Sequence, residues 1–186
     1  MSVDNLRKNG CYRRFSLRLC SLSRKPKQSR ALTVGEKQLA ISVFGDSLNL
    51  EGIQIKTAWW VLKNYAVSPN GNIYFHPKDY LADFSSTSLN YQSWLIHELT
   101  HVWQLQHGLK VVRGALLNRR YQYELIKGKP FFSYGIEQQA RMVQDYFVQR
   151  QRGQDCQALS AFIPFLKDAN LNRSDVNKPD SKTRDA

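Results

Sequence analysis

The sequence predicts an α+β fold in which a small sheet packs on one long helix and a second long helix crosses it. Short strand-like segments lie before residue 77, and two long helical segments follow at about 88–107 and 135–152. Residues 31–167 contain nearly all of the apolar periodicity, and this length suffices for a single core.

The first half of that domain is predicted as one helix followed by strands. Thr33 and Glu36 have the spacing of a capping box, and a helix over 34–44 would end at Gly45. Alternating apolar residues at 53–55 predict a strand, and residues 57–62, rich in Trp and β-branched side chains, are also predicted as strand. The turn sequence Pro-Asn-Gly at 69–71 precedes a third strand at 72–75.

The second half is predicted to be helical. Ser and Thr residues at 85–88 offer N-caps for a helix that runs to about His107 and ends at Gly108. The apolar stripe Ile136, Ala140, Val143 and Phe147 predicts the second long helix, and a short helix is expected over 157–166. Residues 109–133 are ambiguous.

Charge separates the two ends of the chain from the domain. The net charge is +12, but residues 1–30 hold nine Lys/Arg and one Asp, which leaves +4 on residues 31–186. We interpret 1–30 as a basic disordered arm with weak, nonspecific affinity for anionic partners, and 168–186 as a disordered polar tail.

No targeting or membrane-spanning segment is expected. Residues 15–20 alternate instead of forming a continuous apolar run, so a signal peptide is not predicted, and no run approaches 18 apolar residues. Cys11, Cys20 and Cys156 are odd in number and widely spaced, which favours neither disulfides nor a cysteine metal site. The default expectation is a cytoplasmic, reducing compartment.

The main chemical signal is the pattern His97-Glu98-x-x-His101 inside an apolar run. Residues four apart on a helix lie about 40° apart in projection, so both imidazoles can bind one metal ion. Glu98 lies on the neighbouring flank, where its carboxylate can accept a proton from a metal-bound water. The pattern therefore predicts Zn²⁺ as the cofactor, His97 and His101 as ligands, and Glu98 as the catalytic base.

Chance does not explain this pattern well, since its composition-based probability is about two in a thousand for a chain of this length. The surrounding residues make the helix apolar nearly all round, so it should be buried. Burying two imidazoles and a carboxylate without a partner would cost several kcal/mol, and a bound cation removes this objection.

Three residues are candidates for the third ligand. His107 lies too far along a continuous helix, because Gln104 stands where a helix-breaking glycine would be needed to fold the chain back. Glu124 lies in a segment that looks extended. Glu137 is better placed, because it borders the apolar stripe of the second long helix and Ala140 allows a close approach.

The order of these elements resembles the gluzincin branch of zinc metallopeptidases. More closely, residues 69–77, 83–88 and 97–104, together with Glu137-Gln138-Gln139-Ala140 and 145–147, are similar to small zincin-like proteins described as Vgr-related or Rhs-associated in Gram-negative bacteria. The resemblance covers about residues 34–150. It implies a minimal zincin-like fold, ligands His97, His101 and Glu137, the base Glu98, and a link with contractile injection systems such as type VI secretion.

The favoured function is zinc-dependent hydrolysis of an amide bond in a peptide or a peptidoglycan peptide, with Tyr134 and Tyr123 as candidate oxyanion stabilisers. Expected partners are a secretion-system protein or an immunity protein, and delivery by a secretion system would take the chain out of the cytoplasm. One alternative is a non-catalytic, zinc-stabilised module that docks to a secretion or phage-tail protein. Another is a nucleic-acid-binding protein that works through the basic arm.

Overall fold

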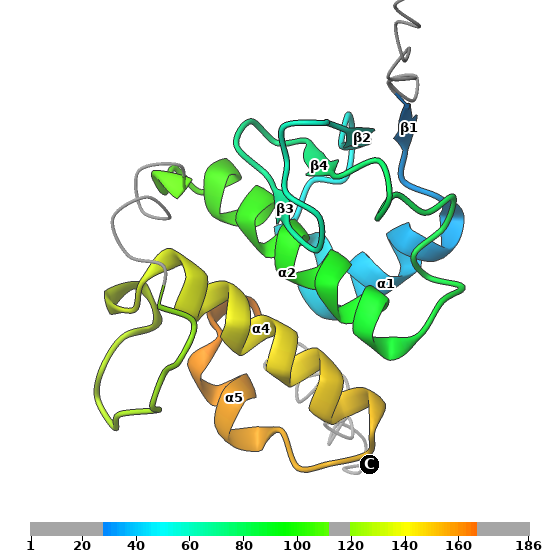
Figure 1. The fold of residues 1–186 in the computed structure, drawn as a ribbon. Coiled ribbons are helices and arrows are strands. Elements are labelled where there is room, and N and C mark those ends of the chain that lie inside the picture. The colour runs from blue at the N-terminus through cyan, green and yellow to red at the C-terminus, as the bar shows by residue number, and fades with distance from the viewer. Residues whose placement is uncertain (1–27, 112–119, 167–186) are drawn as a thin grey trace, which may run out of the picture.

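Four short strands form one mixed sheet in the computed structural model, which describes residues 28–111 and 120–166 (Figure 1). The strand order is β1-β2-β4-β3; β1 and β3 run antiparallel to their neighbours, and β2 and β4 are parallel. The bounds are β1 Ser29–Ala31, β2 Gln54–Thr57, β3 Ala66–Val67 and β4 Ile73–Phe75. The predicted α+β class with a small sheet is thereby confirmed.

The two central strands are held by buried apolar side chains that alternate with more exposed ones. Ile55 of β2 pairs with Ile73 of β4, and Phe75 closes the same face; all three are fully buried. This alternation is the pattern of a sheet with one face on the core. The sheet therefore presents its apolar face to the helices.

The strand predicted over 57–62 is wrong beyond Thr57. The backbone turns after Ala58, where the amide of Val61 donates to the Ala58 carbonyl, and Trp59 and Trp60 are 65% and 54% exposed. Tryptophan and β-branched residues favour strands because they fit a pleated, half-buried surface. Here no described strand pairs with residues 59–62, so the propensity is not realised.

Helix α1 (Val34–Phe44) begins with the predicted capping box, in which the hydroxyl of Thr33 accepts from the amide of Glu36 and the Glu36 carboxylate accepts from the amide of Thr33. The same carboxylate is fully buried and binds Arg30 through two hydrogen bonds of 2.6 and 2.7 Å. Arg30 also lies in β1, so residues 28–30 belong to the folded domain and not to the arm. The predicted boundary at residue 30 is too late because the sequence does not reveal this pairing; residues 1–27 and the tail at 168–186 lie outside the described residues.

Helix α2 (Leu89–Gln106) lies between the sheet with α1 on one side and helices α4 (Ile136–Gln151) and α5 (Gln157–Phe162) on the other (Figure 1). The two long helices confirm the predicted segments, and Gly108, with a φ of 78°, follows the end of α2. Helix α5 ends at Phe162, before Pro164, and is shorter than predicted. Two short 3-10 turns, Gly45–Ser47 and Phe131–Ser133, complete the described elements.

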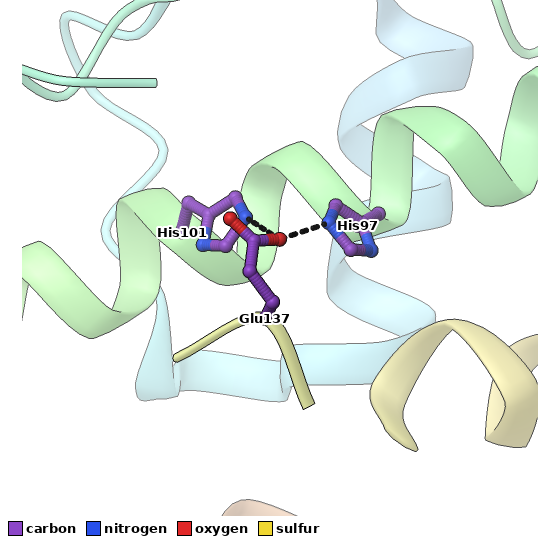
Figure 2. Close-up of side chains that lie close together, drawn as sticks. All are labelled: His97, His101 and Glu137. Carbon is purple, nitrogen blue, oxygen red and sulfur yellow. Dashed lines mark hydrogen bonds and ion pairs between the residues drawn. The ribbon is translucent and has the colours of Figure 1, made fainter. Parts of the chain in front are cut away.

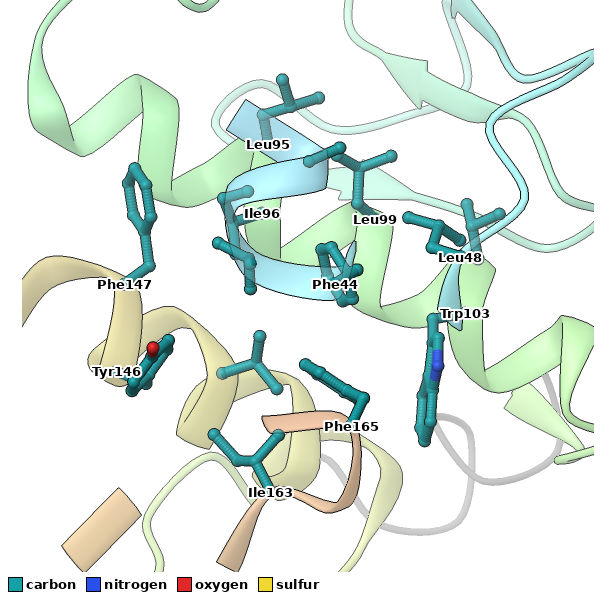
Figure 3. Packing of buried hydrophobic residues seen from close by; sticks show 14 of the residues in the cluster. Phe44, Leu48, Leu95, Ile96, Leu99, Trp103, Tyr146, Phe147, Ile163 and Phe165 are labelled. Atoms are coloured by element: carbon teal, nitrogen blue, oxygen red, sulfur yellow. The ribbon is translucent and has the colours of Figure 1, made fainter. Parts of the chain in front are cut away.

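The core fills the space between these helices (Figure 3). Side chains from α1, α2, α4 and the segment after α5 interdigitate there; they include Phe44, Leu95, Ile96, Leu99, Trp103, Phe147, Ile163 and Phe165. Rings from distant segments meet directly, as Phe165 does with Phe44 and Trp103 at centroid distances of 5.1 and 5.0 Å. This packing fixes α2 against α4 and so sets the positions of the polar residues on their facing surfaces. No described helix is long and apolar enough to cross a membrane.

Candidate metal centre

His97 and His101 of α2 face Glu137 at the start of α4 (Figure 2). The Nε2 atoms of both histidines lie 3.3 Å from the same carboxylate oxygen, Oε2 of Glu137. The three side chains are buried, and their ligand atoms all lie within 4.8 Å of one another. The structure thus brings together the three residues that the sequence and the resemblance put forward as metal ligands.

Two of the three donor spacings match those expected for a metal site. A charge-assisted hydrogen bond between nitrogen and a carboxylate is usually about 2.7–2.9 Å long. Two ligands about 2.0–2.1 Å from one tetrahedral zinc ion are about 3.3 Å apart. Both histidine-to-carboxylate distances are 3.3 Å. Two imidazoles and one carboxylate also form a donor set that zinc accepts.

A chain of buried amides determines how His101 is oriented. The Nε2 of Gln104 donates to the carbonyl of Ile136 and to Oε1 of Gln139, both at 3.0 Å, and Gln139 in turn donates to the carbonyl of Tyr134. Backbone carbonyls only accept, so the nitrogen ends of both amides are fixed. Oε1 of Gln104 therefore faces Nδ1 of His101 at 2.8 Å, and Nδ1 must carry the proton. This tautomer directs Nε2 of His101 toward Glu137 as the ligand atom.

Electrostatics couple His101 to its acidic neighbours. Burial acts to lower the pKa of His101, but the hydrogen bond with Glu137 and the charges of Glu98 and Glu137 outweigh it, so the pKa is raised. Burial acts to raise the pKa of Glu137, but the hydrogen bonds from His101 and His97 outweigh it and lower this pKa to about 2. Without a metal ion, these groups favour a proton held between His101 and an ionised Glu137.

Glu98 lies beside this cluster but is not one of its members. Its side chain is buried, and Oε2 accepts a hydrogen bond of 2.8 Å from the hydroxyl of Ser68. Ser68 follows β3 at the edge of the sheet, so the sheet and α2 together hold the carboxylate. Its charge contributes to the raised pKa of His101. Sequence reasoning missed Ser68, because nothing in the local sequence links residues 30 positions apart.

The two other ligand candidates lie outside the cluster. His107 stands at the exposed end of α2, where its Nδ1 lies 2.8 Å from the carbonyl of Trp103 and its ring packs on the Trp103 ring. Glu124 is exposed, and only its backbone carbonyl makes a described contact, with the hydroxyl of Tyr134.

The hydroxyls of the two tyrosines predicted as oxyanion stabilisers bond to residues outside the cluster. The hydroxyl of Tyr134 donates to the carbonyl of Glu124 and accepts from the amide of Ile126, and the hydroxyl of Tyr123 donates to Asp145. The ring of another tyrosine, Tyr121, lies near the cluster, with its centroid 6.1 Å from that of His97. Sequence reasoning missed it because residues 109–133 carry no clear periodicity.

These observations define the class: an α+β domain with a small mixed sheet and a buried His-His-Glu cluster that can hold a metal ion. The sequence is 41% identical over 150 residues to the type VI secretion system spike protein VgrG2b of Pseudomonas aeruginosa, strain PAO1; the match covers 74% of this chain and 15% of the spike protein. The solved effector domain of Pseudomonas aeruginosa VgrG2b has the same fold, with a TM-score of 0.63 and 41% identity over 72% of this chain and 81% of that one. The chain therefore belongs to the family of the VgrG2b effector domain. No protein-family model matches the sequence.

These matches confirm the Vgr-related part of the expected resemblance, a bacterial origin and the relation to type VI secretion. The chain corresponds to a small part of the spike protein, since it spans 15% of that length. The zincin-like details of the fold, the identity of the metal and the peptidase activity stay predictions.

Proposed function

We propose that this domain is a zinc-dependent peptidase with a minimal zincin-like fold. The observation that carries the proposal is the position of Glu98, a buried carboxylate held beside the candidate metal centre without being one of its ligands. A purely structural metal site has no need of such a residue, whereas a hydrolytic site needs a base next to its ligands.

His97, His101 and Glu137 would hold the ion through Nε2, Nε2 and a carboxylate oxygen. Three protein ligands are typical of catalytic zinc sites, which keep one further position for water or substrate. When bound, zinc supplies a Lewis acid that polarises a carbonyl group and lowers the pKa of a water molecule.

Glu98 is the general base in this proposal. Ser68 donates to Oε2, and no described residue donates to Oε1. Oε1 can therefore take a proton from the attacking water and return it to the leaving amine, while the bond to Ser68 keeps the carboxylate in place. Tyr121 is a further candidate for the oxyanion stabiliser, because its ring lies near that of His97.

The family relation suggests how such an enzyme is used. The similar protein is a type VI secretion spike protein, and we extend to this chain the role of a delivered effector that cleaves a peptide or a peptidoglycan peptide. A secretion-system component would carry it, and an immunity protein would bind it in the producing cell.

The test compares wild-type protein with Glu98→Gln after both are loaded with zinc. Each is incubated with a mixed peptide library and with purified peptidoglycan, and new amino termini are identified by mass spectrometry. We expect cleavage by the wild type only, with equal zinc content in both proteins, because an amide cannot accept the proton. If neither protein cleaves anything while chelation lowers the melting temperature of both, zinc is structural and the domain is a binding module.

A further inference from the structure

A pocket of about 460 Å³ lies beside α4. Its lining residues are Tyr121, Gln122, Tyr123, Arg141 and Asp145. Tyr121 connects the pocket to the metal centre, since its ring lies 6.1 Å from that of His97. On α4, Arg141 and Asp145 follow Glu137 at successive intervals of four residues, which places all three on one face of the helix. The pocket thus lies along the face of α4 that carries Glu137, and one of its lining residues, Tyr121, lies near His97.

A second pocket of about 380 Å³ continues the same surface and shares Arg141 and Asp145 with the first. Its other lining residues are mostly polar and include Asn90, Ser93 and Gln144. Side chains of this kind can donate to and accept from a peptide backbone. The two pockets therefore meet at Arg141 and Asp145.

The charges around Arg141 leave its guanidinium available to a ligand. Its Nε lies 2.9 Å from Oδ1 of Asp145, and Oδ2 of Asp145 accepts from the hydroxyl of Tyr123 at 2.9 Å. Both carboxylate oxygens of Asp145 thus have a partner, and the contact with Asp145 holds the side chain of Arg141 in position. That side chain is 48% exposed, and apart from the contact between Nε and Asp145 its two terminal nitrogens donate no hydrogen bond to any described residue. A guanidinium with free donors binds carboxylates in a planar, two-point arrangement.

We infer that Arg141 recognises a free carboxylate on the substrate, so that the substrate class is a peptide with an acidic group close to the cleaved bond. Side chains four apart on a helix have Cβ atoms about 6 Å apart, and an extended peptide advances about 3.3–3.6 Å per residue. The carboxylate would therefore lie about two residues from the bond that faces Glu137. It can be an acidic side chain or the end of the chain. This inference rests on the proposed peptidase function, because it assigns that site its substrate.

The test measures binding, so that it does not depend on cleavage. The probes are three peptide hydroxamates, which bind zinc through the hydroxamate: one ends in Ala-Ala amide, one in Ala-Ala with a free carboxylate, and one in Ala-Glu amide. Each is titrated into the full chain after its zinc content has been measured. We expect at least one acidic probe to bind about 10–100-fold more tightly than the neutral probe, which is the gain from hydrogen bonds between charged groups. The acidic probe that shows the preference identifies the source of the carboxylate.

Variants assign that preference to the pocket. Arg141→Gln should abolish it and leave the affinity for the neutral probe unchanged, and Arg141→Lys should keep a smaller preference because the ammonium lacks the planar fork. Lys37→Gln removes the same charge from an exposed position of α1 that lines neither pocket, and it should keep the full preference.

Equal affinity for all three probes in the wild type, or a preference that survives in Arg141→Gln, would overturn the inference while the peptidase proposal stands. A zinc-loaded protein that binds no hydroxamate at all, or a protein that binds no zinc, would overturn both.

Discussion

The side-chain oxygen of Gln104 accepts a hydrogen bond of 2.8 Å from Nδ1 of His101. The two residues are three positions apart on α2, and Gln104 is fully buried. In the sequence, Gln104 indicates that the helix continues, because a glycine would be needed there to fold the chain back. In the structure, the same residue fixes the histidine and joins it to α4 through Gln139. The residue at position 104 therefore matters twice: it lets α2 continue, and its side chain orients His101.

We expect Gln104→Met to weaken zinc binding by about 10–100-fold, as is typical when a residue that orients a ligand is lost. Methionine has a similar volume but provides no strong acceptor for Nδ1 of His101. Gln106→Met is the matched control, since Gln106 lies on the same helix and its amide contacts only the backbone of Asn49. Competition with a chelator measures the affinities. Equal zinc affinities in the two variants would show that the amide chain does not orient His101.

The third ligand is tested by removing each candidate carboxylate or imidazole in turn. Glu137→Ala removes a ligand itself, so it should weaken zinc binding more than the loss of an orienting residue does. That smaller loss is expected to be about 10–100-fold. His107→Ala and Glu124→Ala should leave the affinity unchanged, because neither side chain belongs to the cluster. The zinc content after dialysis distinguishes the three variants. Loss of zinc with His107→Ala or Glu124→Ala alone would refute the assigned ligand set.

Much of this arrangement can be predicted from local sequence, because it depends on residues close together in the chain. The capping box of Thr33 and Glu36 fixes the start of α1, and the spacing of His97 and His101 on one helix face follows from helix geometry alone. The apolar stripe of α4 predicts that Glu137 borders the core. These features are present in the folded structure because the tertiary contacts agree with the local preferences.

The rest depends on contacts between distant segments, which one sequence does not reveal. Ser68 reaches Glu98 across 30 residues, and Arg30 reaches the carbonyl of Leu81 across 51. Trp59 and Trp60 have strong strand propensity, but no described strand pairs with residues 59–62. The contacts of Tyr123 and Tyr134 could not be predicted for the same reason, since the path of residues 120–134 is set by contacts with α4 and not by periodicity.

Ser68 is expected to act as a positioning residue for Glu98. Ser68→Ala should lower kcat by about tenfold, since it removes one hydrogen bond worth about 1.5 kcal/mol to a charged group. Zinc content should stay the same, because Ser68 makes no described contact with the candidate metal ligands. The control is Ser86→Ala, which removes an exposed hydroxyl that donates to the carbonyl of Asp83. A fall in kcat of the same size in both variants would show that the loss is not specific to Glu98.

The ion pair between Arg30 and Glu36 joins β1 to the start of α1. Arg30→Gln should destabilise the protein by about 3–5 kcal/mol, because it leaves a buried carboxylate without its cation. Deletion of residues 1–27 should leave stability nearly unchanged, because that segment has too little apolar content to join a core. Chemical denaturation of the two proteins measures both effects. A large loss of stability on deleting 1–27 would show that the segment packs on the domain.

Zinc affinity is expected to increase as the pH rises from 5.5 to 8. In the metal-free protein, the pKa of His101 is raised above its ordinary value of 6.5, and the pKa of Glu137 is lowered from 4.5 to about 2. The contribution of Glu137 to stability is present above pH 4.5, and that of His101 is present below pH 6.5 and is lost as the pH rises through the raised pKa. Zinc must displace the proton from Nε2 of His101, so protons compete with the metal until that pKa is passed.

The gain in melting temperature on adding zinc should therefore be small at pH 5.5 and large at pH 8, while the metal-free protein itself becomes less stable over the same range. Thermal denaturation of metal-free and zinc-loaded protein at both pH values provides the comparison. Gln104→Met should shift the pH range over which the zinc-induced gain in melting temperature appears, since this variant removes the acceptor that helps to raise the pKa of His101. A zinc-induced gain that is the same at pH 5.5 and pH 8 would mean that no proton is released on binding, and His101 would then not be a ligand.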